Sequence, residues 1–130
     1  MSYDHLLVLA SSLLAPYDSK IYKNIKPTML NYQTKHRFAT KTGSTKSDNY
    51  ALGYNPNYVI AVWTGDDEGK EIENTNISKV LFQQIANQLS DKYLEERWYK
   101  VGNNRIVEYR VDPISGQLSQ DGSLYYINIR

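Results

Sequence analysis

Cysteine is absent from this chain of 130 residues. Its absence excludes disulfide bonds, thiol catalysis and zinc sites built on cysteine. Histidine is scarce as well, and the only two, His5 and His36, lack the i, i+4 spacing of a metal-binding pair. We therefore expect no resident metal ion or other cofactor.

Strong charge and long apolar runs are also lacking. The formal net charge is +1 and basic residues never cluster, so nucleic acid is not an expected partner. The longest apolar run is residues 6–10, with 13–15 behind it, whereas a helix that spans a bilayer needs about 20 apolar residues. We expect no membrane contact from this segment. A helical pattern directly after Met1 and Ser2 is typical of a chain that begins inside a longer protein.

The remaining composition is typical of one globular domain. Apolar residues make up 41% and charged residues 22% of the chain. Residues 4–15 are predicted to form a helix, with Asp4 in the first turn and Pro16 after its end. This helix is apolar nearly all round, so we expect it to be buried on more than one side. The polar residues 16–36 are predicted to form a long irregular connection.

Three strands are predicted to follow as an antiparallel meander. They cover Arg37–Ser44, Asn49–Tyr54 and Tyr58–Thr64, and short turn-rich linkers separate them. The third reads YVIAVWT, which is typical of a strand that is buried on both faces. Residues 65–76 are acidic, but their spacing fits no EF-hand, so we interpret them as a solvated loop.

A long helix is predicted over residues 77–98, with Asn76 as its N-cap. One stripe of apolar side chains recurs every four residues along it, and we expect this stripe to face the core. Its members are Ile77, Leu81, Ile85, Leu89 and Tyr93, with Val80 beside them. After the helix, two β-prone segments around a Pro/Gly turn predict a hairpin or a strand pair.

The stretch Lys41-Thr42-Gly43-Ser44 carries the chemistry that the sequence suggests. Lys41 supplies a compact positive charge that suits an anion or polarises a nearby hydroxyl. Strand alternation points the hydroxyls of Thr42 and Ser44 the same way, about 7 Å apart. Gly43 has no side chain, so an extended ligand can approach and pair with the strand. A backbone N–H near Ser44 would then face a developing oxyanion, and the arrangement suits a peptide that ends in a carboxylate.

Taken alone, a K-T-G tripeptide is weak evidence for a site. A polar strand that leads into a turn explains it equally well. A phosphate-binding loop is excluded, because no G-x-x-x-x-G-K-[ST] pattern surrounds the tripeptide.

The neighbouring segments favour a site. KTGST, DNYALGYNP and YVIAVWTGDDEGK together resemble the transpeptidase domain of class A, bifunctional penicillin-binding proteins, and the resemblance runs from about residue 5 to about residue 120. In that family a D-x-W-x-x-G-Y-x-P segment follows the KTG strand, and an apolar strand ending in V-W-x-G comes next. Tyr50 replaces the family's tryptophan, and Thr40 stands where a glycine often precedes the lysine. The matching positions are Asp48, Gly53, Tyr54, Pro56, Trp63 and Gly65.

The resemblance implies acyl transfer. A serine attacks the penultimate D-alanyl carbonyl of a peptidoglycan stem peptide, D-alanine leaves, and an amine of a second stem resolves the acyl-enzyme. β-Lactams acylate the same serine. Carried over by position, the resemblance implies that Lys41 is catalytic and that Thr42, Gly43, Ser44 and Thr45 bind the substrate carboxylate and contribute to the oxyanion hole.

The nucleophile of that reaction is not in this chain. No serine is followed three residues later by lysine. Ser47-Asp48-Asn49 does read S-D-N, but the family's S-x-N precedes the KTG strand by a long stretch, so we interpret the match as a coincidence. We expect the chain to be inactive alone, although the resemblance implies a parent that is a transpeptidase with a separate glycosyltransferase domain.

The resemblance also implies an α+β fold, part of a serine transpeptidase/β-lactamase-like domain. We expect a three-stranded antiparallel meander packed with a long C-terminal helix in residues 1–100, and a β extension in 101–130. The parent would act at the outer face of the bacterial cytoplasmic membrane. Its implied partners are peptidoglycan stem peptides and β-lactams.

Two other classes of function stay open, namely a non-catalytic module that binds peptide or glycan of the cell envelope, and an interaction domain that completes a site on another chain.

The strand Tyr58–Thr64 bears on association, because it has no lysine, proline or inward charge to discourage edge pairing. The matching strand is internal in the family's fold, and its second partner is missing here. We therefore expect a strand-paired homodimer, with Leu124–Ile129 as an alternative partner strand.

Overall fold

A computed structural model describes the chain in two compact units. One unit, called the sheet–helix unit below, is Asn31–Trp98, and the other combines Met1–Leu30 with Tyr99–Arg130. The predicted helix at residues 4–15 and much of the predicted connection at 16–36 lie outside the described residues. Those described are 28–92, 95, 97–99, 106–112, 115, 117, 118, 120 and 123–128.

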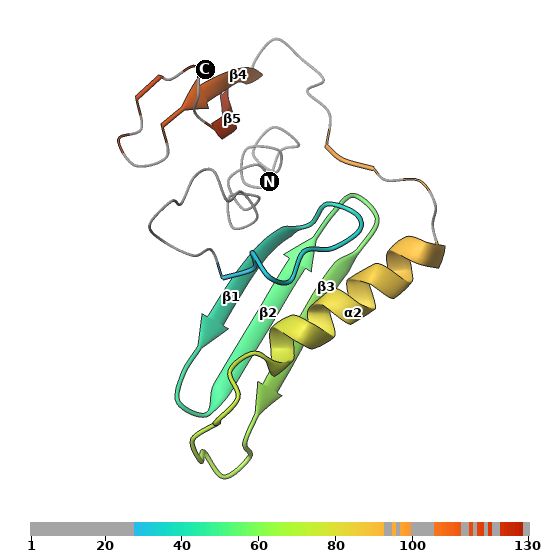
Figure 1. Cartoon of the computed structure of the whole chain (residues 1–130), viewed down its shortest axis with the longest axis vertical. Helices are drawn as coiled ribbons and strands as arrows, with labels where there is room; N and C mark the ends of the chain where they lie inside the picture. The colour runs from blue at the N-terminus through green and yellow to red at the C-terminus, as the bar shows by residue number, and fades with distance from the viewer. Residues whose placement is uncertain are drawn as a thin grey trace. The chain divides into compact units, whose positions relative to one another are not determined.

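The sheet–helix unit is built on a three-stranded antiparallel sheet with strand order β1-β2-β3 (Figure 1). The strands are β1 (Ala39–Ser44), β2 (Asp48–Tyr54) and β3 (Val59–Gly65). The predicted meander is confirmed, and each strand begins and ends within two residues of its predicted bounds.

Two short turns close the meander. Between β1 and β2, the N–H of Thr45 donates to the carbonyl of Asp48 at 2.8 Å. Between β2 and β3, the N–H of Asn55 donates to the carbonyl of Tyr58 at 2.9 Å. The buried side chain of Asn55 accepts from the N–H groups of Asn57 and Tyr58, which is the usual way in which asparagine stabilises a turn.

Helix α2 (Ile77–Lys92) packs on one face of this sheet, over β2 and β3. The side chains that it buries are spaced four apart, but they are not the predicted stripe. Ile77, Val80, Leu81 and Ile85 are exposed instead, so the prediction that they face the core is wrong. The buried residues are Ser78, Phe82, Ala86 and Ser90.

Close packing explains this choice of face. A Cβ at Gly53 in β2 would lie 2.4 Å from Cζ of Phe82, so the absence of a side chain at Gly53 makes room for the ring. The same ring meets Phe38 edge to face, with centroids 5.7 Å apart. Small residues elsewhere on the buried stripe let the helix backbone approach the sheet. Leucine and isoleucine at those positions would hold it away.

The helix also ends earlier than predicted, at Lys92 instead of residue 98. Beyond it, Arg97 donates to the Glu95 carboxylate at 2.9 Å, and residues two apart do not face each other on a helix. The Arg37 guanidinium lies 5.7 Å from the ring centroid of Trp98. These contacts favour the non-helical path of the described residues after Lys92, and α2 is about 24 Å long.

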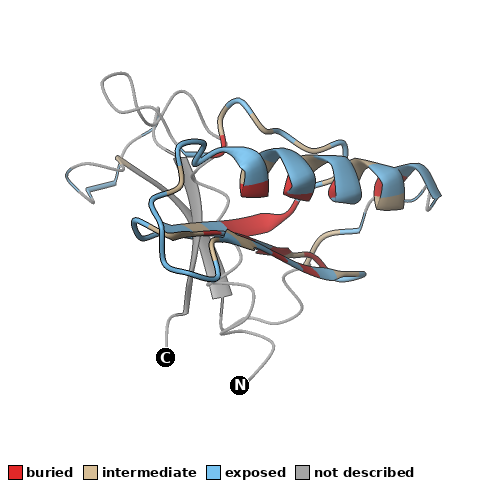
Figure 2. Ribbon diagram, turned by 90° about the horizontal axis from the view of Figure 1, so that it is seen from below, coloured by how far each residue is buried: buried red, intermediate tan, exposed pale blue. Residues whose placement is uncertain are grey.

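The face of the sheet opposite α2 is open within the described part of the chain. Figure 2 shows α2 on one face of the sheet. Ile60 and Val62 of β3 are buried under the helix, whereas Val59, Ala61 and Trp63 are exposed. The prediction that this strand is buried on both faces is therefore wrong for the described residues. The cause is that α2 covers one face only.

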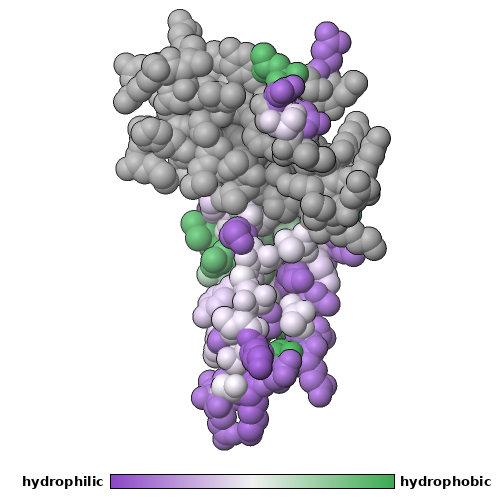
Figure 3. All heavy atoms as spheres, turned by 90° about the vertical axis from the view of Figure 1, so that its left-hand side faces the viewer, coloured by the Kyte–Doolittle hydropathy of each residue, from purple (hydrophilic) through white to green (hydrophobic). Residues whose placement is uncertain are grey.

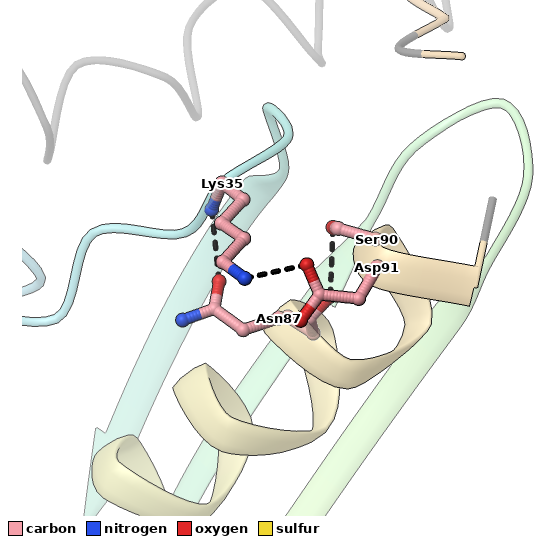
Figure 4. Close-up of polar contacts among 5 residues, drawn as sticks. Lys35, Asn87, Ser90 and Asp91 are labelled. Atoms are coloured by element: carbon pink, nitrogen blue, oxygen red, sulfur yellow. Dashed lines mark hydrogen bonds and ion pairs between the residues drawn. The ribbon is translucent and has the colours of Figure 1, made fainter. Parts of the chain in front are cut away.

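One flank of α2 is held by the segment that leads into β1 (Figure 4). The side chain of Gln83 donates to the carbonyl of Gln33 at 2.8 Å. Asn87 accepts from the N–H of Lys35 at 2.8 Å, and the Lys35 ammonium pairs with Asp91 at 2.5 Å. This flank of the helix therefore faces the β1 side of the sheet.

The acidic residues after β3 form a plain loop, as predicted. The carboxylate of Asp66 accepts the N–H groups of Glu68 and Lys70, so it stabilises the loop from within. Gly69 adopts φ +73°, a conformation that favours glycine. Across the described ranges, no three His, Asp or Glu side chains gather as metal ligands.

The second unit contains the predicted β extension. Strand β4 (Ile106–Val111) pairs antiparallel with β5 (Ser123–Asn128), which confirms the predicted pairing of these two segments. Because β5 pairs with β4, the structure gives residues 124–128 a partner within their own unit. Within the described ranges, no helix combines the length and hydropathy needed to cross a membrane.

Candidate functional site

The candidate site lies on β1, at one edge of the sheet. β1 pairs with β2 along its whole length, from Ala39 opposite Tyr54 to Ser44 opposite Asn49. Among the described residues, no strand pairs with its other side. The K-T-G-S stretch therefore stands on an edge that an extended ligand can reach.

The register of β1 and β2 divides the site residues between two faces. Thr42 and Ser44 lie opposite Ala51 and Asn49, both of which are buried on the α2 side. The prediction that these two hydroxyls share a face therefore agrees with the register. Lys41 and Gly43 alternate with them and belong to the opposite face. β1 therefore presents the Lys41 side chain on one face of the sheet edge and the hydroxyls of Thr42 and Ser44 on the other face.

Lys41 carries a positive charge that no carboxylate neutralises within the described part of the chain. Its side chain is exposed, and its ammonium donates to the carbonyl of Thr42 at 2.5 Å. The long side chain therefore folds back along its own strand. An unpaired ammonium at a strand edge attracts an anion, because the anion gains a charge-assisted hydrogen bond.

Gly43 leaves open space beside this charge. A Cβ there would meet only Cδ2 of Tyr50, at 4.0 Å. Gly43 and Ser44 are both exposed. A ligand backbone can thus approach β1 closely, as the sequence predicts.

Thr45, the last predicted site residue, belongs to the turn. Its hydroxyl lies 2.9 Å from the Asp48 carboxylate and accepts from the N–H groups of Ser47 and Asp48. The hydroxyl of Ser47 lies 3.1 Å from the same carboxylate, while Asn49 is buried under α2. The S-D-N tripeptide therefore builds the turn, which supports its interpretation as a coincidence. Figure 3 shows a largely hydrophilic surface at the end of the sheet–helix unit where the β1–β2 turn lies.

Three of the residues that match the family's motif lie close together on the face of the sheet opposite α2. The indole Nε1 of Trp63 donates to the Asp48 carboxylate at 3.0 Å. A Cβ at Gly65 would lie 2.1 Å from the Trp63 ring, so the indole lies against the glycine backbone. Sequence reasoning missed this contact, although Asp48, Trp63 and Gly65 were all in the motif. The motif thus fixes the turn that follows the K-T-G-S strand.

The Asp48 carboxylate is stabilised by these contacts. Hydrogen bonds from Trp63, Thr45 and Ser47 hold the pKa of Asp48 below its ordinary value of 3.8, with the Trp63 indole as the largest cause. A carboxylate whose folded pKa is lowered favours the folded state at every pH above its unfolded pKa. The gain disappears as the pH falls through the folded pKa.

Asp48→Asn should therefore remove a pH-dependent part of the stability. We expect the unfolding free energy of the unsubstituted chain to fall more steeply than that of the variant as the pH drops below the ordinary carboxyl pKa of 3.8 and through the lowered pKa of folded Asp48. At higher pH the variant should be the less stable of the two. Urea unfolding at each pH measures both profiles.

Asp67→Asn is the matched control, because Asp67 is exposed and accepts no hydrogen bond from the residues that the structure describes. Its profile should follow that of the unsubstituted chain. If Asp48→Asn also ran parallel to the unsubstituted chain, Asp48 would have no role in holding the turn.

The α+β fold described above, an antiparallel sheet with a helix on one face, matches part of the fold of a penicillin-binding protein. Among solved structures, the chain is similar to the crystal structure of penicillin-binding protein 1A from Haemophilus influenzae, with a TM-score of 0.69 and 24% sequence identity. The match covers 98% of this chain and 20% of that chain, so this chain spans one fifth of that protein's length. No protein-family model and no curated protein matches the chain.

Proposed function

We propose that this chain is the C-terminal part of the transpeptidase domain of a class A penicillin-binding protein. In that role it would help to cross-link peptidoglycan by D-alanyl-D-alanine transpeptidation, at the outer face of the bacterial cytoplasmic membrane. The parent would carry the nucleophilic serine in another part of its chain, and a separate glycosyltransferase domain. The fold likeness supports this proposal, together with the resemblance of the motifs.

The observation that carries the proposal is the open edge of β1. It combines an ammonium without a carboxylate partner at Lys41, open space at Gly43 and the exposed hydroxyl of Ser44. An edge of this kind holds an extended peptide by backbone pairing, with side-chain groups on both faces of the strand to fix its end. A C-terminal carboxylate is the group that such an end would present.

In the proposed reaction, β1 binds and orients the stem peptide for attack by the serine. Lys41 supplies charge to the substrate carboxylate or to the hydroxyls that relay the proton. The hydroxyls of Thr42 and Ser44 bind from the other side of the edge. A backbone N–H of β1 stabilises the oxyanion of the tetrahedral intermediate, and one such donor contributes about 3 kcal/mol to the transition state.

Titration of this chain with an acetylated tripeptide that ends in D-alanyl-D-alanine tests the proposal directly. Because half of the site is missing, we expect millimolar binding, worth about 4 kcal/mol. Backbone amide shifts measured by NMR should move at residues 41–45 and stay in place elsewhere. The same peptide ending in L-alanyl-L-alanine should bind less well.

Lys41→Ala should abolish these shifts, whereas Lys46→Ala should keep them, because Lys46 lies in the adjacent turn and off the strand. In a complete transpeptidase, Lys41→Ala should lower the acylation rate by about one to two decades, since a charge-assisted hydrogen bond contributes about 1.5–3 kcal/mol. Stability should change by less than about 0.5 kcal/mol, because the side chain is exposed.

Two results would count against the proposal. Shifts that are unchanged in Lys41→Ala would remove Lys41 from the site. Shifts caused by a chitooligosaccharide, with none caused by the peptide, would favour the non-catalytic glycan-binding module.

A further inference from the structure

The loop between β3 and α2, residues 66–76, is hydrogen-bonded to the turn that follows the K-T-G-S strand. The N–H of Asp66 donates to the carbonyl of Ser47 at 3.1 Å, and the N–H of Ile72 donates to the carbonyl of Lys46 at 2.9 Å. Lys46 and Ser47 are the two central residues of the β1–β2 turn, and Figure 1 shows the loop and the turn at the same end of the sheet. The loop therefore holds the tip of this turn from outside.

The side chain of Asp66 gives the loop its shape. Its Oδ1 accepts from the N–H of Glu68 at 2.9 Å and from the N–H of Lys70 at 3.0 Å. The N–H of Gly69 donates to the Asp66 carbonyl at 3.0 Å. These three bonds fold the chain back on itself, so that it returns to the turn at Ile72. The loop is mostly exposed, so hydrogen bonds hold this fold more than core packing does.

The turn determines how the end of β1 meets the open edge. The N–H of Thr45 donates to the carbonyl of Asp48, so the backbone groups of Thr45 point toward β2. Successive residues of an antiparallel strand alternate in this direction. The N–H of Ser44 therefore points away from β2, toward the edge where a ligand would pair. Ser44 opposite Asn49 is the last pair of the β1–β2 register, so its orientation depends on the turn directly after it.

We propose that Asp66 is a positioning residue for the candidate site. Its side chain shapes the loop, the loop holds the turn, and the turn fixes the direction of the Ser44 N–H. Asp66 thus acts through the backbone and without contact to the ligand. The effect on a ligand rests on the proposed function, whereas the hold on the turn is independent of it.

Charge gives a second way in which this loop would affect an anionic ligand. Residues 66–73 contain five carboxylates and one ammonium. Repulsion by these carboxylates would weaken the binding of a peptide carboxylate, and added salt would screen the repulsion. Positioning depends on the acceptor oxygen of Asp66 instead. Asp66→Asn keeps an acceptor oxygen and removes the charge, whereas Asp66→Ala removes both.

Hydrogen exchange of the full chain tests the hold on the turn without a ligand. In Asp66→Ala, the amides of Thr45 and Ile72 should exchange about tenfold faster, because the lost hydrogen bonds let the turn open locally. Asp66→Asn should exchange at nearly the rate of the unsubstituted chain. The buried core amides of Ile60 and Val62 should keep their rates in both variants.

Asp67→Ala is the matched control. Asp67 is the next residue of the loop, is exposed, and accepts no hydrogen bond from the residues that the structure describes. The variant removes one carboxylate from the same loop and leaves the bonds of Asp66 in place. Its exchange rates should follow those of the unsubstituted chain.

The acetylated tripeptide that ends in D-alanyl-D-alanine tests the effect on the site. Its Kd should rise about three- to tenfold in Asp66→Ala, since the N–H that it meets is less well oriented. Asp66→Asn and Asp67→Ala should keep the Kd of the unsubstituted chain, at low and at high salt. If the unsubstituted chain does not bind the peptide, the proposed function fails, and the exchange of Thr45 still decides whether Asp66 holds the turn.

Four results would overturn the proposal. An unchanged exchange rate of Thr45 in Asp66→Ala would show that the loop does not hold the turn. Equally accelerated exchange at Ile60 and Val62 would mean that Asp66 stabilises the whole unit and positions nothing. An unchanged Kd in Asp66→Ala, despite faster exchange at Thr45, would separate the turn from the site. Tighter binding in both Asp66→Asn and Asp67→Ala, cancelled by salt, would assign the loop a charge effect.

Discussion

A fluorescent penicillin should leave no covalent label on this chain after denaturing electrophoresis. A label requires a serine with a base beside it, and no serine here has a lysine three residues later. Removing the nucleophile of a serine hydrolase lowers kcat by about a millionfold, and only binding and oxyanion stabilisation remain. We therefore expect no band above that of a heat-denatured sample.

Ser44 is the serine nearest to Lys41 in sequence, and the fold explains why the two do not form a nucleophile–base pair. Residues three apart face each other on a helix. On a strand they point to opposite faces and lie about 10 Å apart along the chain. Strand β1 places Lys41 on the face away from α2 and Ser44 on the face toward it. The lysine therefore cannot take the proton of that hydroxyl within one chain.

Mass spectrometry gives the control for this prediction. Intact mass should be unchanged after incubation with the penicillin, in the unsubstituted chain and in Ser44→Ala alike. A complete penicillin-binding protein in the same gel should be labelled. A mass increase equal to one penicillin, mapped to any serine of this chain, would show that the chain carries its own nucleophile.

Much of the fold could be predicted from the sequence, because local patterns determine the meander. β-Branched residues and a tryptophan make up most of β3, and Asn55 begins a turn in which its side chain takes part. The resemblance adds the K-T-G-S strand and its place at one edge. These features depend on residues that are close together in the sequence.

The face that α2 buries could not be predicted in the same way. Hydrophobicity favours the stripe of Leu81 and Ile85, whereas the structure buries Phe82 with small residues on either side. This choice depends on Gly53, which lies far away in the sequence and leaves room for the Phe82 ring. The fit between two elements that are distant in the sequence decided the packing. Such a fit leaves no periodic pattern in the sequence of either element.

The roles of the motif residues around the candidate site also depend on contacts that only the structure shows. Asp48, Trp63 and Gly65 read as neighbours of an active site, yet their contacts show that they hold one turn together. The residues free to meet a ligand are few, chiefly Lys41 and Ser44. A motif shared over a long segment thus supports the scaffold more than the chemistry. The test of function therefore has to address β1.

Gly53→Ala should destabilise the sheet–helix unit by about 1–3 kcal/mol, because the new methyl group overfills a packed core. Its Cβ would lie 2.4 Å from Phe82 Cζ and 3.1 Å from Thr40 Cγ2. Phe82 is fully buried and held against Phe38, so the ring has little room to move. Gly43→Ala is the matched control in the same sheet, since its Cβ would meet only one atom, at 4.0 Å. That control should be neutral or slightly stabilising.

Phe82→Ala should cost more, about 3–5 kcal/mol, because it removes a buried aromatic ring and leaves a cavity. Small domains have a total stability of about 5–15 kcal/mol, so this variant should be largely unfolded in mild denaturant.

Combining Gly53→Ala with Phe82→Leu tests whether the two residues share one space. The smaller side chain should relieve the clash, and the double variant should be more stable than the sum of the single changes by about 0.5–3 kcal/mol. Urea unfolding of the unsubstituted chain, Gly53→Ala, Phe82→Leu and the double variant measures this coupling. Strictly additive changes in the unfolding free energy would mean that the Phe82 ring does not occupy the space above Gly53.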